Sequence, residues 1–133
     1  HQLLASCLAK AARVDEAVET LKSSLPRDAT AEQKAANTNQ IANIYYNAKR
    51  YREAIKAFKE VRKCKDAPDE MKAEATYRSG LCYRAIKHND SARMCMEEVV
   101  KKYPDSHWAR QARGQLYLWG ALKPAAEVRE ETR

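Results

Sequence analysis

Three asparagines recur every four residues in one stretch of the chain. On a helix this spacing puts Asn39, Asn43 and Asn47 on one face, where each amide can donate and accept a hydrogen bond. Asparagine is a poor helix former, so three in register need a reason. A row of amides can bind an extended peptide backbone, which offers the same donors and acceptors. The alternative is a polar face turned to solvent, and the sequence leaves both open.

Catalytic and metal-binding groups do not gather in this way. The four cysteines lack the close pairs of zinc sites, and the three histidines stand apart from them. The chain has no glycine-rich phosphate loop, no His-Glu-x-x-His motif and no nucleophile elbow. The adjacent glutamates at 97–98 and 130–131 would point in different directions on a helix. We therefore expect no enzymatic activity, no metal and no cofactor.

The cysteines also bear on the compartment. Cys82 and Cys95 fall on successive predicted helices and could approach each other, but buried free thiols are the favoured interpretation. Free thiols slightly favour the cytoplasm, and a periplasmic location stays open if a signal was removed. Because the chain opens at His1 without a charged-then-apolar leader, we expect a fragment of a larger protein.

The elements that position these residues are helices, because the composition is rich in alanine, glutamate, lysine and arginine and poor in glycine and proline. Apolar residues at helical spacing predict helices at about 1–11, 14–25, 31–48, 51–64, 71–86, 90–102 and 107–122. We place a turn at Arg13 between the first two. Residues 123–133 are expected to form a frayed or disordered tail.

Local signals mark several helix ends. Asp28 or Thr30 can cap the helix that starts near Ala31, and Gln33, three residues after Thr30, has the spacing of a capping-box partner. Ser106 can cap the helix that starts at His107. Pro104 stops the helix before it, since proline lacks the amide donor.

The helices repeat in pairs. Ala17, Ala54 and Ala92 hold one place in the second helix of each pair, 37 and then 38 positions apart. A small residue where two helices cross lets their backbones approach, and larger residues nearby fill the flanking space. In the first helices the matching small residues are Ala5, Ala42 and Gly80, followed three positions later by Leu8, Tyr45 and Tyr83. In the second helices the large residues four positions after the alanines are Leu21, Phe58 and Met96.

This pattern resembles the tetratricopeptide repeat. The third pair matches at Gly80, Tyr83, Ala92, Val99 and Pro104, and the second at Ala42, Tyr45, Tyr51, Ala54 and Phe58. The resemblance implies an all-α, right-handed solenoid of about three helix hairpins (units about 1–27, 31–67 and 69–104) plus a final apolar helix, 107–122, within residues 1–122. The joint Tyr-Pro-Asp-Ser-His-Trp-Ala-Arg-Gln-Ala resembles those of bacterial tetratricopeptide proteins, including Tol-Pal coordinators and outer-membrane assembly lipoproteins.

The resemblance also implies a concave groove lined by the first helix of each pair. The partner-binding residues predicted there are Asn39, Asn43, Tyr46, Asn47, Tyr77, Arg78, Leu81 and Arg84. In the first unit the groove positions are Gln2, Ser6, Ala9 and Lys10, and in the last helix Gln111, Gly114, Leu118 and Ala121. Packing between repeats is the alternative role of the two tyrosines. Asn43 matches a carboxylate-binding device of the family, but its lysine is missing, and Arg78 and Arg84 could still hold an acidic ligand.

The final helix is apolar enough to predict an interface, with Trp108, Leu116 and Trp119 as its candidates. It can cap the array, meet a further repeat or contact a second copy. We expect capping together with one of the other two.

The function predicted is a scaffold or adaptor that binds a peptide or partner protein in the groove, with self-assembly through the final helix as the alternative. The net charge of +7 permits nucleic acid as a partner. Basic residues are scattered among acidic ones, which favours a solvated mixed-charge surface instead. Apolar runs are too short to span a membrane.

Overall fold

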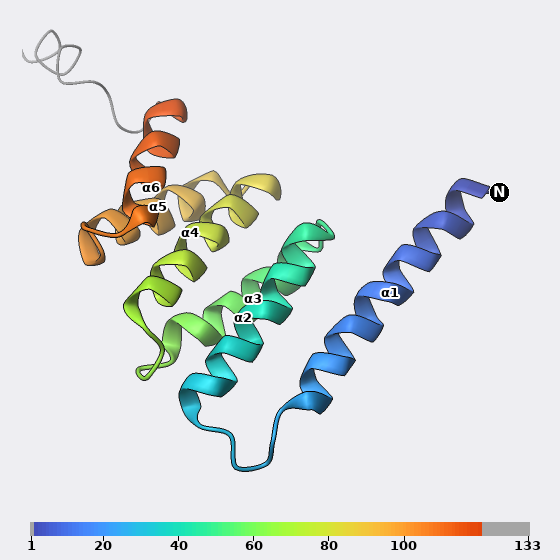
Figure 1. Cartoon of the computed structure of the whole chain (residues 1–133). Coiled ribbons are helices and arrows are strands. Elements are labelled where there is room, and N and C mark those ends of the chain that lie inside the picture. The colour runs from blue at the N-terminus through green and yellow to red at the C-terminus, as the bar shows by residue number, and fades with distance from the viewer. Residues whose placement is uncertain (1, 121–133) are drawn as a thin grey trace, which may run out of the picture.

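The computed structural model describes the backbone of residues 2–120 and the side chains of residues 10–120. This part of the chain folds into six α-helices and contains no strand: α1 (Gln2–Ser24), α2 (Ala31–Asn47), α3 (Tyr51–Lys63), α4 (Asp69–Ala85), α5 (Asn89–Lys102) and α6 (His107–Leu118) (Figure 1). The prediction of an all-α helical repeat is confirmed. The expected tail, 123–133, and the last residues of the final helix, Ala121 and Leu122, lie outside the described residues.

The residues predicted to cap two helices form capping hydrogen bonds in the structure. The Thr30 side chain accepts a hydrogen bond from the Gln33 amide at 3.1 Å, and the Thr30 amide donates to Gln33 Oε1 at 2.9 Å. At the start of α6, Ser106 Oγ accepts from the Ala109 amide at 3.1 Å. Each cap satisfies amides that the first helical turn leaves without partners. Both predictions are confirmed.

The turn predicted at Arg13 is wrong. α1 runs without interruption from Gln2 to Ser24. The stretch Lys10-Ala-Ala-Arg13 contains only good helix formers and no glycine or proline, so nothing local ends the helix there. The first unit therefore contributes one long helix in place of a hairpin. The side chains of residues 1–9, among them Gln2, Ala5, Ser6, Cys7, Leu8 and Ala9, lie outside the described residues.

The remaining helices form two hairpins and a final helix. α2 packs on α3, α4 packs on α5, and each hairpin packs on the helix that follows it. α4 also contacts both α2 and α6, so these three helices lie in one row (Figure 1). α1 packs on α2 alone within the described part of the chain, and its buried anchor is Val18, 2% exposed.

The helices of this row, α2, α4 and α6, all end in the same kind of turn. Lys49 and Lys87 both adopt a left-handed φ of 65°, and Gly120 has a φ of 77°. The amide of each of these residues donates to a carbonyl three residues earlier, on Tyr46, Arg84 and Tyr117. The repeat is therefore visible in the backbone of α6 as well as in α2 and α4.

The core is built at the crossings of the hairpins. Ala42 meets the buried Ala54 and Phe58 between α2 and α3, as the repeat register predicts. Between α4 and α5, Gly80 lies against Ala92 and Met96, which are both fully buried. Ala17, Tyr45 and Tyr83 are only half-buried, and Pro104 is exposed in the joint before α6. Within the described residues, no helix combines the length and apolar character that crossing a membrane requires.

Candidate partner-binding surface

The side chains of α2 and α4 meet in a polar contact on the row of first helices. Asn39 Nδ2 donates a hydrogen bond to Glu74 Oε1 at 3.0 Å. The other carboxylate oxygen of Glu74 lies 3.3 Å from Nε of Arg78, one helical turn further along α4. Glu74 thus joins the asparagine face of α2 to the first predicted groove arginine.

Arg78 is held between two aromatic rings. Its guanidinium carbon lies 5.3 Å from the ring centre of Tyr46 on α2 and 5.4 Å from that of Trp108 on α6. A cation over an aromatic face is attracted by the negative charge of the ring face. One arginine therefore links all three helices of the row. Burial raises the pKa of the Tyr46 phenol, while the nearby Arg78 charge acts in the opposite direction.

The three asparagines predicted to share one face of α2 differ in exposure. Asn39 and Asn43 are half-buried, whereas Asn47 at the end of α2 is exposed. The amide oxygens of Asn39 and Asn43 are shielded from solvent and accept no hydrogen bond from the described part of the chain. A shielded acceptor without a donor is costly, because it has lost water and gained nothing in exchange. This makes the two amides distinct from an ordinary solvated face.

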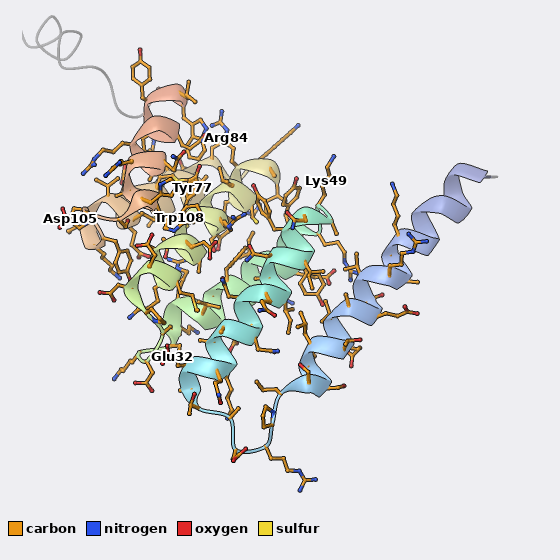
Figure 2. All side chains as sticks on the ribbon, in the orientation of Figure 1. Glu32, Lys49, Tyr77, Arg84, Asp105 and Trp108 are labelled. Carbon is orange, nitrogen blue, oxygen red and sulfur yellow. The ribbon has the colours of Figure 1, made fainter. Side chains whose placement is uncertain are left out.

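The other predicted residues on α4 differ in exposure. Tyr77 is only 6% exposed, and its ring packs on Trp108 with the centroids 5.5 Å apart (Figure 2). Its hydroxyl accepts a hydrogen bond from Gln115 Nε2 at 3.3 Å. Packing between repeats is therefore the role that the structure gives Tyr77. Leu81 is half-buried against the same cluster, and Arg84 is exposed, with its guanidinium carbon 4.9 Å from the ring centre of Trp119.

α6 closes the described end of the array. Leu116 is 4% exposed and belongs to the cluster formed with α4 and α5, while Trp108 and Trp119 pack partly against it. The large apolar side chains left open on this helix are Tyr117 and Leu118, at 51% and 74% exposure. The capping role predicted for the helix is thus met by Leu116, and the free apolar surface lies at its C-terminal end.

The contacts of the two tryptophans with the predicted groove arginines were missed by sequence reasoning. Trp108 and Trp119 were assigned to an interface, yet each stacks on a predicted groove arginine. Arg78 and Trp108 are 30 positions apart, and Arg84 and Trp119 are 35 apart. No local spacing joins these pairs, because they meet only through the packing of α6 on α4.

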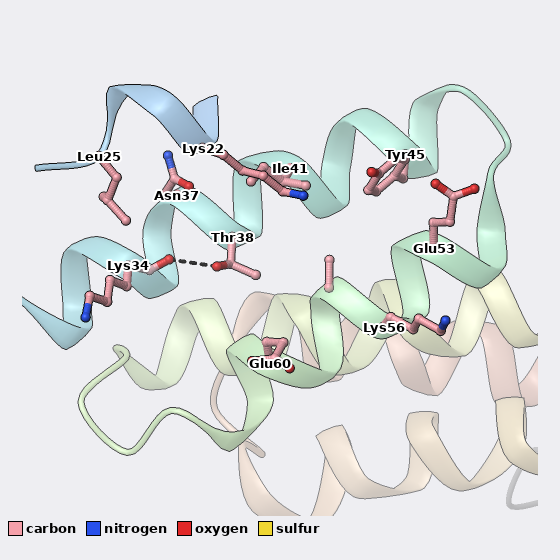
Figure 3. Close-up of a pocket in the computed structure, with 11 residues that line it drawn as sticks. Lys22, Leu25, Lys34, Asn37, Thr38, Ile41, Tyr45, Glu53, Lys56 and Glu60 are labelled. Atoms are coloured by element: carbon pink, nitrogen blue, oxygen red, sulfur yellow. Dashed lines mark hydrogen bonds between the residues drawn. The ribbon is translucent and has the colours of Figure 1, made fainter. Parts of the chain in front are cut away.

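Two hollows lie beside α1. One, of about 630 Å³, is lined by Leu25 just after α1, Ile41 of α2 and Ala57 of α3, with lysines and glutamates also in its lining (Figure 3). Another, of about 730 Å³, lies between α1 and the end of α2 around Val14 and Ile44. Both exist because α1 packs loosely on its neighbour. Neither was predicted from the sequence.

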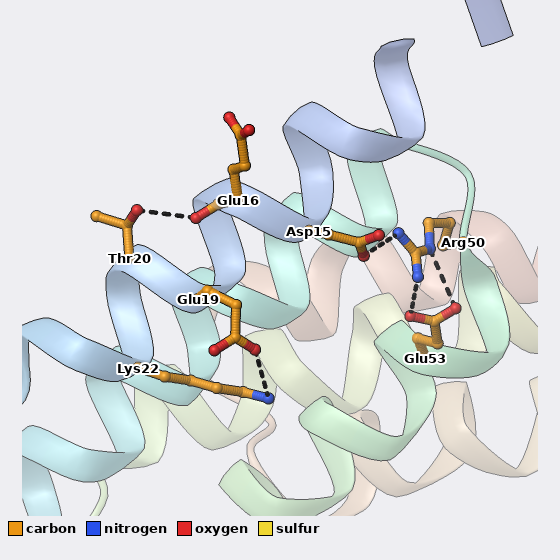
Figure 4. A network of polar contacts seen from close by, with 7 residues as sticks. All are labelled: Asp15, Glu16, Glu19, Thr20, Lys22, Arg50 and Glu53. Atoms are coloured by element: carbon orange, nitrogen blue, oxygen red, sulfur yellow. Dashed lines mark hydrogen bonds and ion pairs between the residues drawn. The ribbon is translucent and has the colours of Figure 1, made fainter. Parts of the chain in front are cut away.

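A polar network fastens α1 to the turn between α2 and α3. Arg50 Nη1 lies 2.8 Å from Asp15 Oδ1, and its Nη2 lies 2.6 Å from Glu53 Oε2 (Figure 4). The guanidinium also lies over the ring of Tyr45, 5.1 Å from its centre. Hydrogen bonds to Asp15 and then to Glu53 raise the pKa of Arg50, so this cation stays charged.

The cysteines of the described residues are free thiols and belong to no metal-binding group. Cys82 and Cys95 are buried free thiols, as predicted, and Cys64 is a half-buried one. The side chain of Cys7 lies outside the described residues. Among the residues that the structure describes, no group of three or more histidine, cysteine, aspartate and glutamate side chains could hold a metal ion.

The two hairpins α2–α3 and α4–α5 are followed by α6, and α2, α4 and α6 lie in one row. This arrangement defines a helical-repeat protein. Residues 39–61 and 74–106 match family models described as tetratricopeptide repeat. These matches cover most of α2–α3 and nearly all of α4–α5, and they support a tetratricopeptide-repeat protein. Such repeats are generally protein–protein interaction modules without catalytic activity. No curated protein and no solved structure matches the chain.

Proposed function

We propose that this chain is an interaction scaffold of the bacterial tetratricopeptide type that binds an extended peptide or partner segment across α2, α4 and α6. The observation that carries the proposal is the amide of Asn43. Asn43 is half-buried, about one helical turn before Tyr46, and its shielded oxygen accepts no hydrogen bond from the described residues. A peptide backbone amide is the kind of donor that would satisfy this oxygen once the Asn43 side chain turns toward the groove.

The neighbours of Asn43 suit such a ligand. Asn47 offers a second, exposed amide one turn further along α2. The Tyr46 ring contacts the Arg78 guanidinium and makes a T-shaped contact with the Tyr51 ring, 6.3 Å between centroids, so it is already held in place. A side chain held in place loses little freedom on binding, which favours affinity.

Pull-down with two groove variants tests this proposal. Asn43→Ala and Tyr46→Ala should each reduce capture of the partner from a native lysate by about tenfold, because each removes a contact worth about 1–2 kcal/mol. The matched control is Lys101→Ala, an exposed residue of α5 in the other layer. Circular dichroism confirms that the variants remain helical. Capture that is unchanged in both variants would reject the groove.

A second function, self-assembly, is favoured by the open end of α6. Tyr117 and Leu118 are exposed there, and a Cβ added at Gly114 would meet no atom within 4 Å. In α4, the glycine at the crossing is instead covered by the partner helix α5. Light scattering at increasing concentration should show association that Leu118→Lys abolishes. A strict monomer at high concentration would exclude this function.

A further inference from the structure

The row of first helices contains two arginines that stack on tryptophan, and they differ in one respect. Arg78 stacks on Trp108 and also holds the carboxylate of Glu74, 3.3 Å from its Nε. Arg84 stacks on Trp119, 4.9 Å from the ring centre, and pairs with no carboxylate of the described part of the chain. Both arginines stack on a tryptophan, but only Arg78 has a carboxylate partner among the described residues.

Stacking leaves a guanidinium ready to bind an anion. The N–H donors of arginine lie in the plane of the group, so a ring against its face does not occupy them. The ring also restricts the side chain, which reduces the entropy lost when a ligand binds. A planar carboxylate accepts two such donors at once, which is the strong form of this contact. Arg84 is exposed, so a ligand can reach these donors.

The charges nearby favour an acidic ligand. Glu74 is already engaged by Asn39 and Arg78. At the end of α4, Lys87 adds a second exposed cation after Arg84. Leu81 is half-buried about one turn before Arg84 and packs against the same cluster as Trp119, and the exposed Leu118 precedes Trp119 in the chain, so both offer apolar contact. A glutamate or aspartate flanked by an apolar residue fits this combination.

We propose that Arg84 and Trp119 form an anchor site for an acidic side chain of the peptide bound across α2, α4 and α6. This inference rests on the proposed function and names the chemistry of its ligand. A stacked guanidinium can bind carboxylate or phosphate groups. We assign this site to the carboxylate of an aspartate or glutamate side chain.

Fluorescence anisotropy with defined peptides tests the anchor. The probe is a short labelled peptide of glycine, serine, leucine and glutamate with an amidated end, and its counterpart carries glutamine in place of glutamate. The intact chain should bind the glutamate peptide about tenfold more tightly at low salt, since charged hydrogen bonds are worth about 1.5–3 kcal/mol. Equal binding, or no binding of either at about 1 mM, would overturn the proposal.

Two further peptides separate the anion sources. One is the glutamine peptide with a free C-terminal carboxylate, and the other is the glutamine peptide phosphorylated on serine. Selective binding of either, without binding of the glutamate peptide, would overturn the assignment to side-chain carboxylates.

Variants link the preference to the two residues. Arg84→Gln should abolish the preference for glutamate, and Arg84→Lys should restore only part of it, because lysine lacks the planar fork. Trp119→Ala should weaken the preference and Trp119→Phe should keep most of it. The matched control, Arg52→Gln on α3, removes the same charge from an exposed arginine of the other layer and should leave the preference intact. If Arg52→Gln has the same effect as Arg84→Gln, the preference is a general charge effect and the site is rejected.

The two proposals can fail separately. If Asn43→Ala loses the pulled-down partner while Arg84→Gln keeps both that partner and the glutamate preference, the scaffold function stands and the anchor falls. If neither Asn43→Ala nor Tyr46→Ala affects capture, the groove itself is rejected, whatever the peptides show.

Discussion

Gly80 and Met96 are so close that a Cβ on the glycine would lie 2.8 Å from the terminal methyl carbon of the methionine. The same Cβ would lie 3.1 Å from the Cβ of Cys95 and 3.3 Å from the backbone oxygen of Ala92. The methionine end can move, but the Cys95 Cβ and the backbone oxygen cannot do so without shifting α5. Gly80 is therefore required by the close approach of α4 and α5.

Gly80→Ala should lower the free energy of unfolding by about 1 kcal/mol. Overpacking costs about 1–3 kcal/mol, and the better helix propensity of alanine returns about 1 kcal/mol. Gly114→Ala is the matched control. It meets open space on α6, so only the propensity gain remains and stability should rise by about 0.5–1 kcal/mol. Urea unfolding followed by circular dichroism measures both, and a Gly80→Ala protein as stable as wild type would show that the crossing is not tight.

The attachment of α1 should depend on the contact between Asp15 and Arg50. Asp15→Asn removes the partner that Arg50 reaches on α1 at 2.8 Å and leaves its contact with Glu53 in place. Asp15 is largely exposed, so the loss is below about 1 kcal/mol, and amide exchange in residues 10–24 should speed up by less than about fivefold. Hydrogen exchange measured by mass spectrometry resolves this change, with α4 and α5 as internal reference.

Glu53→Gln serves as the control for α1, because it weakens a contact that does not involve this helix. In about 1 M salt the difference between Asp15→Asn and wild type should vanish, since the screening length falls to about 3 Å. A difference that persists in high salt would mean that packing, and not charge, holds the helix.

The parts of the fold that sequence reasoning predicted rest on short-range signals. Thr30 and Gln33 are three residues apart, and Ala54 and Ala92 mark their hairpins by type and register. The turn at Arg13 was placed between two apolar stripes without a local helix breaker, and the good helix formers around it continue the helix. Two apolar stripes in succession do not by themselves require a turn, because the local residues determine whether the chain bends between them.

The candidate surface was predictable only along each helix. Asn39 and Asn43 share a face of α2 because of their spacing, and the structure places Asn39 in contact with Glu74 of α4. The contact of Arg78 with Tyr46 and Trp108 depends on how three helices pack on one another, and no spacing within one helix encodes it. The burial of Tyr77 has the same origin, since it follows from the position of α6.

The two buried thiols should resist alkylation in the native protein. Burial raises the pKa of Cys82 to about 12 and also raises the pKa of Cys95, where Arg62 acts in the opposite direction. The thiolate is the reactive form, so iodoacetamide at pH 8 should modify the half-buried Cys64 well before either of them. Mass mapping of the labelled peptides measures the order, and early labelling of Cys82 would mean that α4 opens readily.

The raised pKa of Cys82 should make the free energy of unfolding depend on pH in the alkaline range. The folded protein keeps the Cys82 proton up to about pH 12, whereas an unfolded thiol releases it near its ordinary value of 9.0. The contribution is therefore complete below about pH 9 and is lost as the pH rises toward 12, by about 1 kcal/mol per unit. Cys82→Ala should show a shallower decline in urea midpoints across this range. An equal decline in both proteins would contradict the assignment.

The two helix caps should report on different ends of the array. Thr30→Ala and Ser106→Ala each remove a side-chain acceptor at a helix start, which costs about 1 kcal/mol. Both tryptophans of the chain, Trp108 and Trp119, belong to α6 or its C-cap, so tryptophan fluorescence reports on this end. In an array whose units contact only their neighbours, a local loss is felt most strongly nearby. Ser106→Ala should lower the fluorescence-detected melting midpoint more than Thr30→Ala does, while circular dichroism registers both. If the two variants shift both signals by the same amount, the array unfolds as one cooperative unit and the separate response of its ends is excluded.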